Sequence, residues 1–204
     1  MVASAVRYIR ACRLAPRPNR MFKIKKNPKI TSVQFELQVK RFLESTAGKL
    51  KDFQTVHRES MDGQDGTYEI DITARFKIFG ADFLVLVECK NHKNHIKREH
   101  VQTLHAKQLS LSAQKAMLFA TNPFQDGAVE YANQHGIALV QLASGETLYF
   151  TKSGNGTPLP DSLPAYVGWL IAKHDRASDG VSHSLVDPQY PDALNKFLFG
   201  PPES

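Results

Sequence analysis

The sequence predicts an α/β fold, a three-layer α/β sandwich with a mixed central sheet. Two β-rich segments, 68–78 and 83–90, are joined by a connection short enough for an antiparallel hairpin. Two later apolar runs, 116–121 and 137–142, each follow a segment with helical periodicity, which favours parallel strands and right-handed crossovers. The expected order of elements is therefore α-β-β-β-α-β-α-β.

The first helix is expected over residues 31–47. Thr31 and Gln34 have the spacing of a capping box at its start. The apolar stripe of this helix consists of Phe35, Val39, Phe42 and Leu43. Residues 53–59 alternate weakly and are interpreted as a strand, and two Asp-Gly pairs within 61–67 predict a turn.

The clearest strand signal follows that turn. Residues 68–78 alternate between apolar and polar, whereas residues 83–90 are apolar on both faces until they end in charge. A run that is apolar on both faces is typical of a buried central strand. Gly80 and Ala81 are expected to form a two-residue hairpin loop between the two strands.

This hairpin brings charged residues together. With that loop, Asp71 lies opposite Lys90 and Thr73 opposite Glu88, and opposed residues share a face of the sheet. We therefore expect Asp71, Glu88 and Lys90 to form a cluster on one face. The opposite face is expected to carry Cys89, Val87 and Ile70.

Two further helices are expected, over residues 98–113 and 126–135. The character of the chain changes beyond residue 152, where seven of the eleven prolines lie. We expect a main domain at 31–150 and a Pro-rich C-terminal extension at 151–204. One helix around Trp169, over 163–174, is predicted in this extension, and the rest is interpreted as an irregular tail.

The net charge of +6 is concentrated at one end of the chain. Nine of the 26 basic residues and none of the 20 acidic residues lie within 1–30. Such an arm is expected to be disordered and to contact a polyanion such as nucleic acid. An upstream start codon ahead of Met21, or a transit peptide, explains the same composition.

Composition excludes several classes of protein. Two cysteines are too few for a disulfide framework or a four-thiolate zinc site, which favours a cytoplasmic location. The longest apolar run, 83–87, is too short to span a membrane. Glycine-rich phosphate loops and the GxSxG nucleophile elbow are missing.

The expected charged cluster suits a particular chemistry. Two carboxylates and an amine at the end of an apolar strand are costly to bury unless they are paired or bind a metal ion. Carboxylate oxygens are ligands for Mg²⁺, and a neighbouring lysine can hold a water and balance charge on a phosphate. Asp71, Glu88 and Lys90 thus suit phosphodiester hydrolysis. A structural salt bridge from Lys90 to Asp71 or Glu88 explains the same spacing.

Five stretches carry a family resemblance. They are FE (35–36), DGTYEIDI (65–72), LVECK (86–90), VQTL (101–104) and ATNPFQDGAVEYANQHGIALV (120–140). In this order they resemble the PD-(D/E)xK nuclease superfamily, and more narrowly the Mrr-like restriction endonuclease catalytic domain, over residues 31–145. The resemblance implies a restriction-endonuclease-like fold, DNA as substrate, a role in DNA restriction–modification, and Mg²⁺, for which Mn²⁺ can substitute.

The resemblance also implies roles for individual residues. Asp71 and Glu88 would bind the metal ion, Lys90 would assist the attacking water, and Glu36 on the first helix would join the metal site. The string before the aspartate departs from the GDGGID-like pattern of many relatives, since GQDGTYEID has two extra residues. This leaves Asp65 open as the metal ligand, although strand placement favours Asp71.

Two other acidic positions, Glu69 and Glu88, bear on the resemblance. Glu69 shares the Asp71 face by the period of a strand, and is either an extra ligand or a solvated strand-end charge. Many relatives carry Gln in place of Glu88, but Glu is the commoner residue across the superfamily.

The segment after Lys90 is rich in basic residues and histidines. Lys93, Lys97 and Arg98 are expected to contact DNA phosphates, and Gln102 to reach the metal cleft. A solvated loop and helix face is the plainer interpretation. The histidines of this segment, which also suggest zinc, are His92, His95, His100 and His105; no cysteine completes such a site.

Three functions remain open at this stage. The first is a Mg²⁺-dependent DNA endonuclease, and the second is a catalytically inactive DNA-binding module of the same fold. The third is a structural protein or toxin partner whose charges form only salt bridges. A homodimer would suit a nuclease that must cut two strands.

Overall fold

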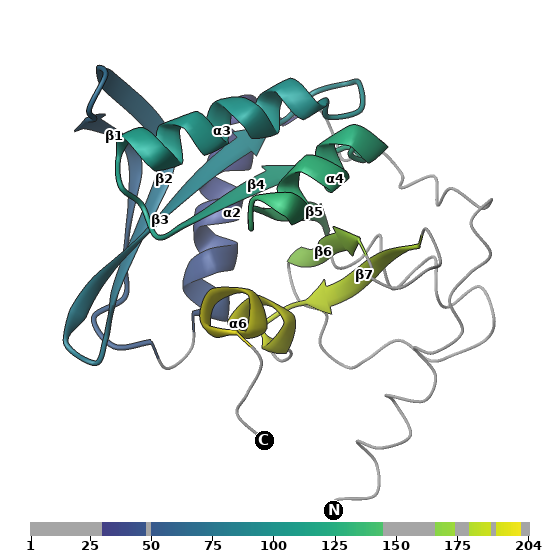
Figure 1. Ribbon diagram of the computed structural model, residues 1–204. Coiled ribbons are helices and arrows are strands. Elements are labelled where there is room, and N and C mark those ends of the chain that lie inside the picture. Colours follow the sequence, from purple (N-terminus) through teal and green to yellow (C-terminus); the bar gives the residue numbers. More distant parts are fainter. Residues whose placement is uncertain (1–29, 48–49, 145–165, 174–179, 189–190, 201–204) are drawn as a thin grey trace, which may run out of the picture.

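The computed structural model describes residues 30–47, 50–144, 166–173, 180–188 and 191–200. Within these ranges seven strands form one mixed sheet, in the order β1-β2-β3-β4-β5-β6-β7. Helices cover both faces of the sheet (Figure 1). The predicted α/β sandwich with a mixed central sheet is confirmed. Most of the predicted basic arm, 1–29, lies outside the described residues.

The elements follow one another as helices and strands of moderate length. The helices are α2 (Ser32–Thr46), α3 (Arg98–Ser110), α4 (Asp126–Gln134) and α6 (Asp192–Phe199). The strands are β1 (Gln54–Asp62), β2 (Thr67–Ile78), β3 (Ala81–Lys90), β4 (Lys115–Ala120), β5 (Ala138–Ser144), β6 (Tyr166–Lys173) and β7 (Val181–Val186). None of the described helices is long and apolar enough to cross a membrane.

Helix α2 begins as its sequence predicts. The Thr31 hydroxyl accepts a hydrogen bond from the Gln34 backbone N–H at 3.2 Å, and Gln34 Oε1 accepts one from the Thr31 backbone N–H at 2.8 Å. This reciprocal pair satisfies two N–H groups that a helix start otherwise leaves unpaired. The apolar stripe from Phe35 to Leu43 then faces the sheet.

The β2–β3 hairpin turns at Phe79 and Gly80, one residue earlier than predicted. Ile78 pairs with Ala81, and both turn residues have positive φ, 50° at Phe79 and 84° at Gly80. Positive φ at both central positions indicates a type I′ turn, which favours glycine at its second position, whereas the prediction placed Gly80 first. The pairing therefore shifts by two residues, and an even shift leaves side chains on their predicted faces.

Strand β2 changes face at Asp71. Ile70 and Ile72 are both fully buried, yet Ile70 lies in the core beneath α3 and α4, and Ile72 in the core beneath α2. The β1–β2 register skips Arg58, which has a φ of 54°, opposite this point. The expectation that Ile70 shares the face of Cys89 is therefore wrong, because the regular alternation of the strand is broken here.

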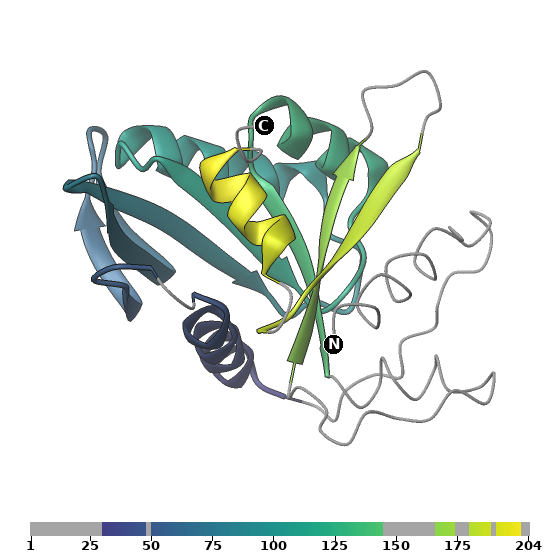
Figure 2. The ribbon, with the colours of Figure 1, turned by 90° about the horizontal axis from the view of Figure 1, so that it is seen from below.

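The centre of the sheet is parallel, as predicted. β3 pairs with β4, and β4 with β5, in parallel register, and α3 and α4 provide the crossovers. Figure 2 shows α3 and α4 along one side of the sheet and α2 on the other. Two separate apolar cores result, one beneath α3 and α4 and one beneath α2 and α6.

Residues 166–173 form the strand β6, so the helix predicted over 163–174 is wrong there. The segment is rich in aromatic and β-branched residues, and it pairs antiparallel with β5. A Cβ added at Gly168 would lie 3.0 Å from both Phe42 Cζ and Val140 Cγ1. Glycine thus permits the close packing of this strand against α2, a constraint that helical periodicity cannot reveal.

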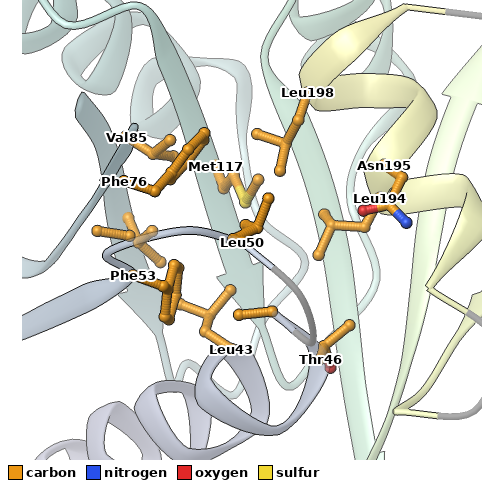
Figure 3. A pocket seen from close by; sticks show the side chains of 13 residues that line it. Leu43, Thr46, Leu50, Phe53, Phe76, Val85, Met117, Leu194, Asn195 and Leu198 are labelled. Atoms are coloured by element: carbon orange, nitrogen blue, oxygen red, sulfur yellow. The ribbon is translucent and has the colours of Figure 1, made fainter. Parts of the chain in front are cut away.

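Residues 181–186 and 192–199 form a strand and a helix where an irregular tail was expected. β7 pairs antiparallel with β6, and α6 follows it. Figure 3 shows Leu194 and Leu198 of α6 around a small apolar pocket that Leu50 and Met117 also line. The described parts of the Pro-rich extension therefore continue the sheet and cover its core.

Candidate active site

The carboxyl end of β3 presents two charged side chains on one face. Leu86 lies in the core beneath α3 and α4, and Glu88 and Lys90 follow it at the strand period of two. Cys89 lies in the opposite core, 9% exposed, as expected. Burial raises the pKa of its thiol well above the ordinary value, which suits a packing role better than a nucleophile.

Asp71 lies where β2 separates from β3. The Cys89 backbone N–H donates a hydrogen bond to Asp71 Oδ2 at 2.7 Å, so this carboxylate takes the place of a backbone acceptor. Ile72 pairs with Val87, which makes Glu88, rather than Lys90 as predicted, the next residue opposite Asp71. The break in β2 therefore directs an aspartate towards the charged end of β3.

The charges at this point influence one another. Burial raises the pKa of Asp71, and the negative charges of Glu88 and Glu36 add to the rise. The Cys89 N–H and the Lys90 ammonium act in the opposite direction. The charges of Glu88, Lys90 and Glu36 therefore all act on Asp71.

Glu88 is paired with two lysines. It is 6% exposed, and Lys90 Nζ lies 3.1 Å from its Oε2. Lys107 of α3 forms an ion pair with Oε1 of the same carboxylate and donates to the Glu69 carbonyl oxygen at 3.2 Å. The site prediction did not include Lys107. The sequence pattern that could have identified Lys107 is its position three residues after the buried Leu104, which places it on the inward side of the helix.

Glu36 projects from α2 into the protein rather than into solvent. It is 5% exposed, and β1 holds it through His57 Nε2 at 2.8 Å and Arg58 Nε at 3.0 Å. Burial alone raises the pKa of Glu36, but hydrogen bonds and charges from Arg58 and His57 outweigh it and keep that pKa below its ordinary value. Glu36 therefore remains ionised next to the cluster.

Asp65, the other candidate for the aspartate position, lies in the β1–β2 turn. It is exposed and accepts hydrogen bonds from the hydroxyls of Tyr68 and Ser110, which hold its pKa below the ordinary value. These contacts fasten the turn to the end of α3. Asp71, and not Asp65, is the aspartate beside Glu88.

The catalytic-domain model of the Mrr family, described as restriction endonuclease, matches residues 28–149, more than half of the chain. The chain belongs to this restriction endonuclease family. Its mixed sheet with helices on both faces is accordingly a restriction-endonuclease-like fold. The matched segment of this Mrr-type chain holds the whole charged cluster and ends before β6.

Two solved structures resemble part of this Mrr-type chain. A protein of unknown function, AF1548, is 25% identical with a TM-score of 0.44, and the match covers 53% of this chain and 56% of that one. Protein VC1899 from Vibrio cholerae is 18% identical with a TM-score of 0.37, over 52% of this chain and 28% of that one. The chain thus spans only part of each. No curated protein matches it.

The predicted DNA-contacting residues lie in the loop after β3 and on α3. Lys93, Lys97, Arg98 and Gln102 are all exposed. Lys97 Nζ lies 3.7 Å from a carboxylate oxygen of Glu99, and the Arg98 guanidinium lies 5.0 Å from the centre of the Tyr131 ring. These side chains form no cluster with Asp71 and Glu88 in the described contacts.

The loop that carries these residues is anchored to its neighbour. Ile96 forms a parallel bridge with Phe124 of the next loop. The Ile96 backbone N–H donates to the Pro123 carbonyl oxygen at 2.9 Å, and the Gln125 N–H to the Ile96 carbonyl oxygen at 2.9 Å. These contacts fix the basic segment relative to the end of β3.

The carboxylates of the Mrr-type site are its candidate donors for a divalent ion. In the part of the chain that the structure describes, no group of three or more His, Cys, Asp or Glu side chains is arranged to hold a metal ion. The histidines therefore form no zinc site there, and Glu36 completes no three-carboxylate cage. The carboxylates of Asp71 and Glu88 are of the ligand type that Mg²⁺ takes, one or two at a time, together with waters and phosphate oxygens.

Proposed function

We propose that this chain is a Mg²⁺-dependent endonuclease that hydrolyses DNA phosphodiester bonds. The observation that carries the proposal is the Cys89 N–H to Asp71 hydrogen bond, which holds a partly buried carboxylate near the point where β3 presents Glu88 and Lys90. Membership of the restriction endonuclease family supports the same reaction class.

The metal ion would be held by Asp71 and Glu88, with waters and a substrate phosphate as its other ligands. When bound, it would supply charge stabilisation at the phosphate and a water of lowered pKa. Mn²⁺ would substitute for Mg²⁺. Glu36 is proposed as a further support of this ion, because its charge acts on Asp71 and it stays ionised.

Lys90 is proposed to handle the attacking water. Its ammonium has three donors, and its contact with Glu88 uses one of them. The remaining donors can orient a water and balance the negative charge that develops on the phosphate. Lys93, Lys97, Arg98 and Gln102 are proposed to contact the DNA beside this site.

Nicking of a supercoiled plasmid tests the proposal. We expect conversion to the open circle with Mg²⁺ or Mn²⁺, and none with EDTA. Lys90→Ala should abolish nicking, while Lys77→Ala, which removes an exposed lysine 3.3 Å from Asp82 at the far end of the hairpin, should leave it intact. Equal activity of the Lys90→Ala protein would contradict the proposed role of that lysine.

A catalytically inactive DNA-binding module is the alternative. It is favoured by the double pairing of Glu88, because two ammonium groups can replace the charge of a metal ion in a purely structural cluster. DNA binding in a gel-shift assay without nicking under any metal condition would favour this alternative. Neither binding nor nicking would leave the charges as structural salt bridges only.

A further inference from the structure

Glu88 sits between two ammonium groups that come from different elements. Lys90 lies on β3 itself, and Lys107 reaches the same carboxylate from α3 while donating to the Glu69 carbonyl oxygen on β2. The side chains of Glu88 and Lys107 are 8% and 17% exposed. Water and salt therefore screen this pair less than a surface ion pair.

The cluster without a metal ion is close to electrical balance. The carboxylates of Asp71 and Glu88 are matched by the ammonium groups of Lys90 and Lys107, and Glu36 is matched separately by Arg58. A divalent cation added to Asp71 and Glu88 would leave an excess of positive charge in a site of low exposure. Each phosphate of a nucleic acid supplies one negative charge that offsets this excess.

We propose that Lys107 is a positioning residue that competes with the divalent cation for Glu88, so that the cation binds tightly only when nucleic-acid phosphates enter the site with it. This inference rests on the proposed function of Asp71 and Glu88 as metal ligands. Coupling between two ligands is reciprocal, so the cation strengthens phosphate binding by the same factor.

The contacts of Lys107 suit this role. Its ammonium has three donors, and the Glu88 carboxylate and the Glu69 carbonyl oxygen account for two of them. The third donor remains for a phosphate oxygen. The Glu69 contact can hold the Lys107 ammonium in place while the Glu88 carboxylate binds a cation. Lys107 can therefore exchange its contact with Glu88 for one with a phosphate oxygen and stay in the site.

Calorimetric titration with Mn²⁺ tests the proposal without any measurement of activity. The titration is made on the whole chain, alone and with a short duplex whose phosphorothioate linkages keep the backbone charge and slow hydrolysis. Without DNA, Lys107→Met should bind Mn²⁺ at least about fivefold more tightly than wild type, the lower end of typical coupling between sites. The strengthening of Mn²⁺ binding by DNA should be large in wild type and smaller in the variant.

Two controls separate charge competition from a structural role. Lys107→Arg keeps the charge, and Lys77→Met removes a remote lysine, so both should bind Mn²⁺ within about twofold of wild type. If Lys107 only supported the fold, its loss would loosen the site and weaken Mn²⁺ binding. Equal or weaker binding by Lys107→Met would therefore overturn the inference.

The remaining outcomes distinguish a failure of the inference about Lys107 from a failure of the proposed function. If Lys107→Met does not fold, Lys107→Gln, which retains a donor but no charge, should show the same tighter binding, and equal or weaker binding would overturn the inference. A wild type that binds Mn²⁺ through Asp71, while both uncharged variants bind it no better, would sink the inference alone. A wild type that binds no Mn²⁺ with or without DNA would sink the proposed function as well.

Discussion

Two acidic side chains of the site, Asp71 and Glu36, lie in opposite electrostatic surroundings. Asp71 is partly buried, and this loss of water together with the negative charge of Glu88 raises its pKa. Glu36 is buried against Arg58 and His57, which lower its pKa despite burial. A shift in pKa between folded and unfolded protein makes stability depend on pH, and the sign follows the direction of the shift. The two residues should therefore respond to neutralisation in opposite ways.

Asp71→Asn should stabilise the protein at neutral pH when no metal ion is present. Because the pKa of Asp71 is raised, its protonated form favours the folded protein. This stabilisation is complete below the ordinary aspartate pKa of about 3.9 and is lost as the pH rises through the raised pKa. The amide oxygen can still accept the Cys89 N–H. Melting curves in EDTA between pH 3.5 and 8 should show a gain at pH 7 that disappears near pH 4.

The same variant should lose the response to metal ions. Mn²⁺ raises the melting temperature of a protein that binds it in the folded state only, so the wild type should shift and Asp71→Asn should shift little. A structural salt bridge predicts the reverse pattern. A variant less stable in EDTA, beside a wild type indifferent to Mn²⁺, would contradict the assignment of Asp71 as a ligand.

Glu36→Gln should destabilise the protein at neutral pH by about 1–3 kcal/mol, because buried hydrogen bonds to Arg58 and His57 are weakened. A lowered pKa gives stability that is present above the ordinary glutamate value of about 4.3 and is lost as the pH falls. Urea unfolding should show the deficit at pH 7 and its narrowing below pH 4. Glu44→Gln, at an exposed pair with Lys40, should cost less than about 1 kcal/mol.

At the scale of elements, the β2–β3 turn places a glycine and a phenylalanine at two positions of positive φ, which suits the glycine and strains the phenylalanine. Phe79 is fully exposed and has a positive φ of 50°, a conformation that costs a bulky residue more than asparagine. The turn thus orders the hairpin register that sets Asp71 opposite the end of β3, although one of its residues is strained.

Phe79→Asn should stabilise the protein by about 0.5–1 kcal/mol, because Asn-Gly is the preferred pair for a type I′ turn. Gly80→Ala, at a φ of 84°, should be destabilising and serves as the matched control. Urea midpoints at two protein concentrations measure both effects. A loss of stability in Phe79→Asn would mean that the Phe79 ring is covered by a contact in solution.

At the scale of the whole molecule, α6 and the last two strands complete the fold beyond the family match. Leu194 is 6% exposed and packs in the core that α2 also covers, and Val186 at the end of β7 is 1% exposed. The family segment ends at residue 149, so these elements lie outside it. They nevertheless bury side chains in the same core that supports β3.

Leu194→Ala should destabilise the protein by about 2–4 kcal/mol, since it removes a buried side chain beside an existing apolar pocket. Lys196→Ala, on the exposed side of the same helix, should change stability by no more than about 0.5 kcal/mol. Urea unfolding measures both. A change of less than about 1 kcal/mol in Leu194→Ala would show that α6 contributes little to the core.

The order of the elements from α2 to β5 could be predicted because their signals are local. A capping box at Thr31, alternation of apolar and polar residue types in the sequence of β2, and a run apolar on both faces in β3 each depend on residues a few positions apart. The family motifs rest on the same local strings. The prediction that Asp71, Glu88 and Lys90 share one region followed from which face of the hairpin each side chain occupies. An error of two residues in the pairing does not change that face.

By itself, then, the sequence determined the α/β class and the hairpin, and it predicted Asp71, Glu88 and Lys90 for the candidate site. Only the tertiary structure decided that the Cys89 N–H holds Asp71 near the end of β3, that Lys107 pairs with Glu88 and that residues 166–173 are a strand. Each of these depends on contacts between distant segments: the break in β2 opposite Arg58, the ion pair from α3 to Glu88, and the pairing of β5 with β6. The secondary-structure propensity of a local segment does not depend on such distant partners, and pairing and burial between elements override it.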